Sequence, residues 1–156
     1  MIRLDRWLHL QRRFVGSLSS TPPDPADEVW ALGWLAPAEQ ARWWRLDVRD
    51  RRHAVAVAHR ALAQLGREPT RAEVAGFLLH DCGKVASGLG TAGRVLATLR
   101  GSGRPGSRTA TYHRHEAIGA AWLAADGSDP VTVALVARST EAPADALAAL
   151  QAADDA

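Results

Sequence analysis

The apolar residues of this chain recur with the period of a helix throughout, and no segment alternates apolar and polar residues as a half-buried strand does. This periodicity is the strongest constraint on the fold, because helices without strands must bury their apolar stripes against one another. The sequence therefore predicts an all-α protein. Its 156 residues, 47% of them hydrophobic, are enough for one domain with a substantial core.

The N-terminal part predicts an amphipathic helix that is set off from the rest of the chain. Residues 2–18 place apolar side chains on one face and arginines mostly on the other, and the run SSTPPDP then interrupts the helix. We therefore divide the chain into an N-terminal helix with its linker, residues 1–24, and a helical domain, residues 25–156. Packing on its own domain is the first interpretation of this helix, and contact with a membrane or a partner is the alternative.

Tryptophan is concentrated just after the linker, in two short helices that meet near Pro37. Asp24 followed by Pro25 is typical of a helix cap with a first-turn proline. The tryptophans are interpreted as core and interhelical packing, and their segment is also a candidate surface for a homodimer. These residues are Trp30, Trp34, Trp43 and Trp44.

The strongest predicted helix, residues 48–65, ends at Gly66 and carries a histidine on its inner face. The inward stripe consists of His53, Val57, Ala61 and Leu65, which follow one another at spacings of four. His59 lies off this stripe and is interpreted as a surface or packing residue.

The next helix opens with a capping box, TRAE, in which Thr70 is the cap and Glu73 reaches back. It runs through apolar residues into the sequence FLLHDCGK, where His80 and Asp81 stand side by side and we expect Gly83 to stop the helix. Composition predicts a turn and a short helix after it, and then a loop over residues 101–110.

Three further helices are predicted in the C-terminal half. The first begins near His113 and places His115 on its inner face, the second opens at Asp129 and Pro130, and the last opens at Pro143. In the last helix Asp154 shares a face with apolar residues, whereas Asp155 is turned about 100° away.

Several helices thus direct a histidine or an aspartate inward: His53, His80 with Asp81, His115, and Asp154. Buried carboxylates and imidazoles are costly unless something satisfies them, and several of them are hard to satisfy with one another alone. A bound cation satisfies carboxylates and imidazoles together. Imidazole and carboxylate ligands without thiolate suit manganese, iron, cobalt, nickel or zinc, with magnesium as an alternative.

Composition narrows the function classes further. The single cysteine, Cys82, allows no internal disulfide and no thiolate-rich zinc site, so we expect a reducing, cytoplasmic location. We expect no signal peptide and no membrane span. A net charge of +2 is too small to indicate nucleic-acid binding. Lys84 is the only lysine among 19 basic residues, which favours a position where a compact ammonium is needed.

The motifs RRHAVAVAHRAL, LLHDCGK, HEAIGAAWL and LQAADDA, in this order, resemble the HD-domain superfamily of metal-dependent phosphohydrolases over residues 48–156. The resemblance implies an HD-domain helical bundle, here with an added N-terminal amphipathic helix, in a small stand-alone bacterial member. It also implies four metal ligands, which correspond to His53, His80, Asp81 and Asp154.

Members with two metals add two histidines, and here the match is incomplete. His115 fits the first of them, but Ser139 and Thr140 stand where the second is expected. This departure leaves a complete set of ligands for one metal ion and one further histidine, and it disfavours a two-metal mechanism.

The resemblance implies hydrolysis of a phosphoester, with a nucleotide or a related phosphomonoester or diester as substrate, by water that the metal activates. Asp81 would orient the water, Lys84 would bind the phosphate oxygens, and His115 or Glu116 would act as general acid or base. Arginines are candidates for the rest of an anionic substrate, although a solvated surface position is the first interpretation for each: Arg52, Arg94, Arg104 and Arg108.

Two functions of other classes stay open. A catalytically weak or inactive domain that binds a metal or nucleotide as a regulatory module is favoured by Ser139 and Thr140 and by the position of Asp154 near the C-terminus. A helical DNA-binding or scaffold protein is disfavoured because it explains none of the inward histidines. Cys82 is interpreted as a small buried spacer, and His9 and His113 as surface residues.

Overall fold

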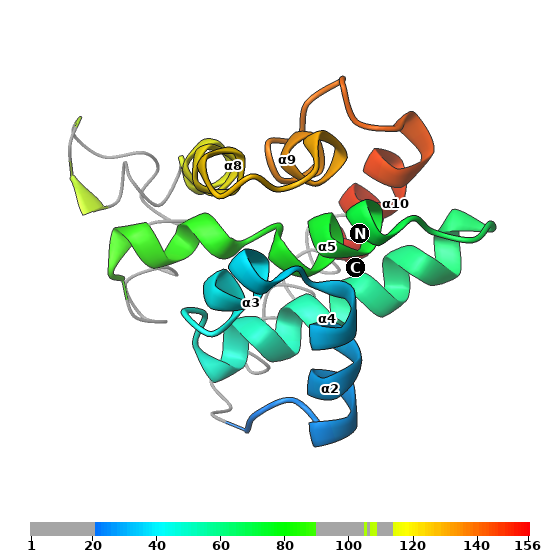
Figure 1. The fold of residues 1–156 in the computed structure, drawn as a ribbon, viewed down its shortest axis with the longest axis horizontal. Helices are drawn as coiled ribbons and strands as arrows, with labels where there is room; N and C mark the ends of the chain where they lie inside the picture. The colour runs from blue at the N-terminus through cyan, green and yellow to red at the C-terminus, as the bar shows by residue number, and fades with distance from the viewer. Residues whose placement is uncertain (1–20, 90–104, 106, 109–113) are drawn as a thin grey trace, which may run out of the picture.

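The computed structural model describes residues 21–89, 105, 107–108 and 114–156, and in these ranges it contains helices and no strand. The all-α prediction is confirmed for this part of the chain. The predicted helix at 2–18, with His9, and the segment 90–104 lie outside the described residues, as does His113. The elements, labelled as in Figure 1, are α2 (Pro25–Trp34), α3 (Pro37–Trp43), α4 (Val48–Leu65), α5 (Arg71–Leu79), the 3-10 helix η1 (Cys82–Ser87), α8 (His115–Ala125), α9 (Pro130–Val136) and α10 (Ala144–Asp155).

Side chains near the helix ends account for where the helices begin and end. The carboxylate of Asp24 accepts a hydrogen bond from the second amide of α2, and Asp129 does the same for α9. Thr70 and Glu73 form the predicted capping box at the start of α5. Gly66 ends α4 in the left-handed conformation with φ 69°. The predicted starts and the end of the longest helix are therefore confirmed.

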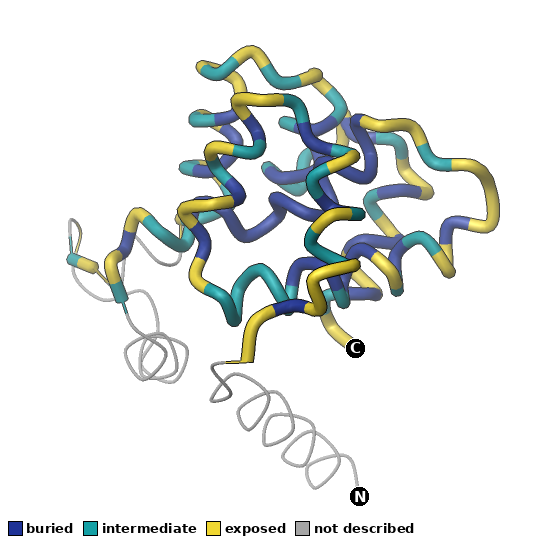
Figure 2. The backbone as a smooth tube through the Cα atoms, turned by 60° about the horizontal axis from the view of Figure 1, so that its bottom comes forward, coloured by how far each residue is buried: buried dark blue, intermediate teal, exposed yellow. Residues whose placement is uncertain are grey.

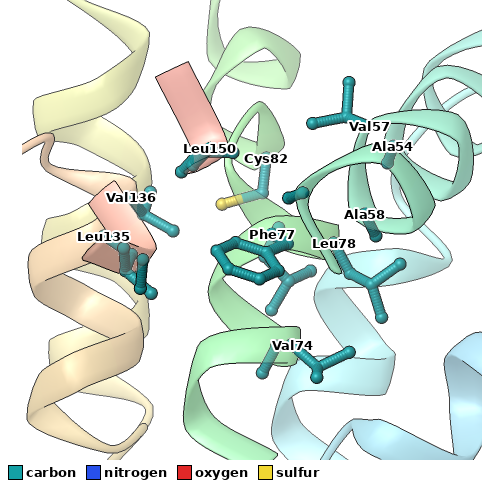
Figure 3. Close-up of a cluster of buried hydrophobic side chains, with 14 of the residues drawn as sticks. Ala54, Val57, Ala58, Val74, Phe77, Leu78, Cys82, Leu135, Val136 and Leu150 are labelled. Carbon is teal, nitrogen blue, oxygen red and sulfur yellow. The ribbon is translucent and has the colours of Figure 1, made fainter. Parts of the chain in front are cut away.

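Helix α5 is the centre of the bundle, with α4 on one side and α9 on the other (Figure 1). Every residue of α5 from Ala72 to Leu79 is buried, as expected of a helix that is apolar all round. Figure 3 shows Phe77 between Leu135 of α9 and the small residues of α4, such as Ala58. Helix α10 packs along α4, and Figure 2 shows exposed residues on the outer sides of the helices.

The tryptophans after the linker do not all belong to the core. Trp43 is fully buried, and Trp30 and Trp34 pack against the core from partly buried positions. Trp44 is 52% exposed, so its assignment to the core was wrong. The guanidinium of Arg51 stacks over its ring at 5.1 Å, which covers one face of the indole at the surface.

Gly83 does not stop the helix, which is a correction of the sequence-based prediction. Helix α5 ends at Leu79, His80 is its C-cap residue, and Gly83 lies inside η1. A Cβ atom at Gly83 would lie 1.8 Å from the carbonyl oxygen of His115 and 2.7 Å from the amide nitrogen of Gly119. Glycine is therefore needed here because η1 and α8 meet backbone to backbone, and this contact places His115 beside the end of α5.

Replacing Gly83 by alanine is expected to lower the free energy of unfolding by about 3 kcal/mol or more, because α8 must move away from η1 to admit the methyl group. Chemical denaturation measures the change. Gly33→Ala is the matched control, since a Cβ there meets nothing within 4 Å, and it is expected to be neutral or stabilising by less than about 1 kcal/mol. Equal stability of the two variants would contradict the close contact.

None of the helices in the described ranges has the length and apolar character needed to cross a membrane.

Candidate metal centre

Three of the predicted ligands lie together although α4, α5 and α10 supply them from distant parts of the chain. One ligand atom from each of His53, His80 and Asp154 lies within 4.8 Å of the other two, so this group can hold a metal ion. The Oδ1 atom of Asp154 is 3.2 Å from Nε2 of His53 and 3.5 Å from Nε2 of His80. Inward positions on three helices have therefore converged on one point.

The contacts of His80 leave one of its ring nitrogens available as a ligand. Its Nδ1 atom lies 2.8 Å from the carbonyl oxygen of Phe77, which only accepts hydrogen bonds, so Nδ1 carries the proton in the neutral imidazole. The lone pair is then on Nε2, which is buried and has no hydrogen-bond partner among the described residues. A histidine fixed in this way by a backbone carbonyl is the usual arrangement for a metal ligand.

The donor atoms of this group fit a divalent transition metal. Two imidazole nitrogens and one carboxylate oxygen suit zinc, manganese, iron, cobalt and nickel, and the set contains no thiolate. The side chains of His53 and Asp154 are 34% and 22% exposed, whereas His80 is fully buried. An ion held here would therefore be reachable from solvent on the side of His53 and Asp154.

Asp81 lies beside the three-residue group and is 3% exposed. Its Oδ2 atom is 3.4 Å from Nε2 of His80 and 3.9 Å from Nε2 of His53, and the ammonium of Lys84 pairs with the same oxygen. Its Oδ1 atom is 3.3 Å from Nε2 of His115. The structure thus brings four of the predicted site residues together around Asp81, while the roles of Asp81 and His115 as metal ligands stay predictions.

Charge in this cluster is balanced internally. Burial disfavours a charged imidazole at His80, but the carboxylates of Asp81 and Asp154 outweigh it and raise the pKa of His80 to about 9. Burial likewise opposes ionisation of Asp81, yet His80 and Lys84 hold the pKa of this carboxyl well below its usual range. The pKa of Asp154 is also lowered, against the effect of burial, by its contacts with His53 and His80. In the metal-free protein a charged His80 therefore lies between two carboxylates at neutral pH.

The metal-free protein is expected to lose stability as the pH rises from about 6.5 through about 9. An imidazole in the unfolded chain has a pKa of about 6.5, and that of His80 in the folded chain is about 9, so the folded state binds this proton more tightly. The stabilisation is complete below the lower value and is lost above the higher one. Thermal unfolding in chelator across this range tests the effect. The same pH profile in His80→Gln, which has no imidazole there, would contradict it.

Arg138 belongs to the site although sequence reasoning missed it. It directly precedes Ser139 and Thr140, which stand where members with two metals have a second histidine. Its Nη2 donates a hydrogen bond of 2.8 Å to Oδ2 of Asp154. Its Nε lies 3.6 Å from Oε1 of Glu116. Because Arg60 also donates to the carbonyl oxygen of Ala153, at 2.9 Å, two arginines hold the end of α10 on which Asp154 lies.

The other residues singled out from the sequence have structural contacts of their own. Arg52 donates to the carbonyl oxygen of Thr21 at 2.6 Å and Arg108 to that of Ser87 at 3.0 Å, while Arg94 and Arg104 lie outside the described residues. Cys82 is buried, as predicted, and burial raises the pKa of its thiol to about 12. His59 stacks on Trp30 at the surface, as predicted.

A scan against models of known protein families finds no match, and searches of curated proteins and of solved structures give none either.

Proposed function

We propose that this chain is a metal-dependent phosphohydrolase of the HD-domain type, in which His53, His80 and Asp154 hold one divalent cation. The observation that supports this most strongly is the buried Nε2 of His80. It lies 3.4 Å from Oδ2 of Asp81 and 3.5 Å from Oδ1 of Asp154, and next to His53. The two carboxylates already favour a positive charge at this nitrogen in the metal-free protein, so the same place suits a cation.

When bound, the ion activates water as a nucleophile near neutral pH and stabilises charge on phosphate oxygens. The residues of the chain then orient the reactants. The carboxylate of Asp81, fixed by His80, Lys84 and His115, accepts a hydrogen bond from the attacking water. The ammonium of Lys84, 19% exposed, binds a phosphate oxygen as negative charge grows on it.

His115 is the general base in this proposal, because its Nε2 is held 3.3 Å from Oδ1 of Asp81, next to the water that Asp81 orients. A bond forms between phosphorus and the oxygen of the attacking water, whose proton passes to His115. The ester bond on the opposite side of phosphorus breaks at the same time, and the departing oxygen takes a proton from solvent. Glu116, which is more exposed, contacts Arg138 and is the alternative base.

A screen of phosphoesters against divalent metals tests the proposal. Nucleoside monophosphates and triphosphates, p-nitrophenyl phosphate and its bis-ester are each incubated with Mn²⁺, Co²⁺, Ni²⁺, Zn²⁺ or Mg²⁺. Turnover is expected with at least one transition metal and is expected to stop in chelator. Absence of turnover in a preparation that holds one equivalent of metal would contradict the enzyme assignment.

A regulatory module that binds a metal or nucleotide without turnover is the second candidate. Lys84 pairs with Asp81 and so occupies an oxygen of the carboxylate that the catalytic role requires, which supports this candidate. Ser139 and Thr140, in place of a second histidine, support it as well. This candidate predicts nucleotide binding that depends on the metal, with no product formed.

A further inference from the structure

The backbone of Arg138 has a conformation that favours glycine. Four described residues have a left-handed backbone, and three of them are glycines, Gly66, Gly88 and Gly127, whereas Arg138 has φ 54°. The amide of Arg138 donates to Leu135 and the amide of Ser139 donates to Ala134, which are the two hydrogen bonds that close a helix at such a residue. A side chain there costs conformational free energy, so an arginine at this position calls for a reason.

The guanidinium of Arg138 is directed toward the metal group but is not fully satisfied by it. One nitrogen is bound to Oδ2 of Asp154, the oxygen that does not face the imidazoles. Its Nε is buried and makes no hydrogen bond to any described residue, although Glu116 lies 3.6 Å away. The two histidines already contact the carboxylate of Asp154, so pairing with Asp154 does not by itself account for Arg138. Its Nε also remains available to a further acceptor.

Lys84 has the corresponding position on the other carboxylate. It pairs with Oδ2 of Asp81, which lies 3.4 Å from Nε2 of His80, while Arg138 pairs with Asp154, whose Oδ1 lies 3.5 Å from the same nitrogen. Two cationic side chains, from η1 and from the end of α9, therefore flank the point where the metal ligands meet. They are 19% and 15% exposed, so both are partly accessible to solvent.

We propose that Arg138 binds phosphate and that, together with Lys84, it selects a terminal phosphate group, which makes a phosphomonoester the preferred substrate. This inference rests on the proposed function. A divalent ion, Lys84 and Arg138 are three cationic groups around one point, and a phosphomonoester presents three terminal oxygens and two negative charges. A diester presents only two such oxygens and one charge. Guanidinium also matches two phosphate oxygens at once, which an ammonium cannot.

The test compares wild type with three variants at this position, R138G, R138K and R138A. Glycine removes the charge and suits the left-handed backbone. Lysine keeps the charge but cannot bind two phosphate oxygens at once, and alanine removes the charge but keeps the backbone strain. Calorimetry measures the binding of Mn²⁺ to each protein and then the binding of inorganic phosphate to each Mn²⁺-loaded protein. Thermal unfolding shows that each variant is folded.

R138G and R138A are expected to bind phosphate about tenfold or more weakly than wild type, with R138K between them and wild type. Their Mn²⁺ affinity is expected to stay within about threefold of wild type or to rise, because a nearby positive charge is removed. The preference for p-nitrophenyl phosphate over its bis-ester, as the ratio of kcat/KM values, is expected to fall in R138G and R138A.

Unchanged phosphate affinity in R138G would overturn the inference. An equal loss of Mn²⁺ affinity and phosphate affinity would overturn it too, because Arg138 would then only hold Asp154 in place. Wild-type protein that binds Mn²⁺ but no phosphate would overturn it as well. The Mn²⁺ titration of wild type is read separately, so failure of the metal site is distinguished from failure of Arg138. Phosphate binding without turnover would contradict the enzyme assignment and still support this role of Arg138.

Discussion

Replacement of His80 by glutamine is expected to weaken the binding of Mn²⁺ or Zn²⁺ by more than about a hundredfold. His80 is the one ligand candidate that is fully buried, and its Nε2 has no other hydrogen-bond partner among the described residues. An amide side chain does not replace an imidazole nitrogen as a ligand for these ions. Metal titration with a competing chromogenic chelator measures the loss, and the His53→Ala variant, at a more exposed position, is expected to show the same effect.

His59→Ala is the matched control for both variants. His59 lies on the same helix as His53 but stacks on Trp30, and its side chain is 48% exposed. Its replacement is expected to leave metal affinity unchanged. Because both residues lie on α4, a loss of metal affinity caused only by a weaker helix would appear in His59→Ala as well as in His53→Ala. Equal metal affinities in all three variants would mean that the ion binds elsewhere.

Asp81→Asn is expected to lower kcat by about a thousandfold in the metal-loaded protein. The amide keeps the shape of the carboxylate but loses the charge that holds Lys84 and His115, so the water and the phosphate lose their orientation together. Kinetics with the best substrate of the screen measure the change. A titration of Mn²⁺ binding alongside separates a loss of the ion from a loss of orientation.

Asp155→Asn is the control for this variant, since Asp155 is an exposed carboxylate at the end of α10. We expect it to turn over substrate as wild type does. A kcat for Asp81→Asn within about tenfold of wild type would remove Asp81 from the catalytic role and favour the regulatory module.

Local signals in the sequence were enough to predict most of the fold. The capping box of Thr70 and Glu73, and glycine at position 66, act within a few residues of themselves, so the helix ends that they define were predicted correctly. Periodicity placed His53 and Asp154 on inner faces, because the direction of a side chain on a helix depends only on its position along the helix.

The features that the sequence did not reveal depend on contacts between elements. Gly83 looked like a helix stop, but it is required by the approach of α8, which no local pattern reports. Arg138 was missed because its left-handed backbone depends on where α9 ends, and its pairing with Asp154 depends on the packing of α9 beside α10. Trp44 is exposed although its neighbour Trp43 is fully buried, and the sequence pattern did not show which of the two faces the core.

The position of a bound ion tests the metal centre most directly. Crystals soaked in Mn²⁺ or Zn²⁺, with diffraction data collected at the absorption edge of the metal, locate the ion by its anomalous scattering. We predict one ion per chain, about 2.0–2.3 Å from Nε2 of His53, Nε2 of His80 and an oxygen of Asp154. An ion bound away from Nε2 of His80, or no ion at saturating metal, would contradict the metal centre and the function proposed from it.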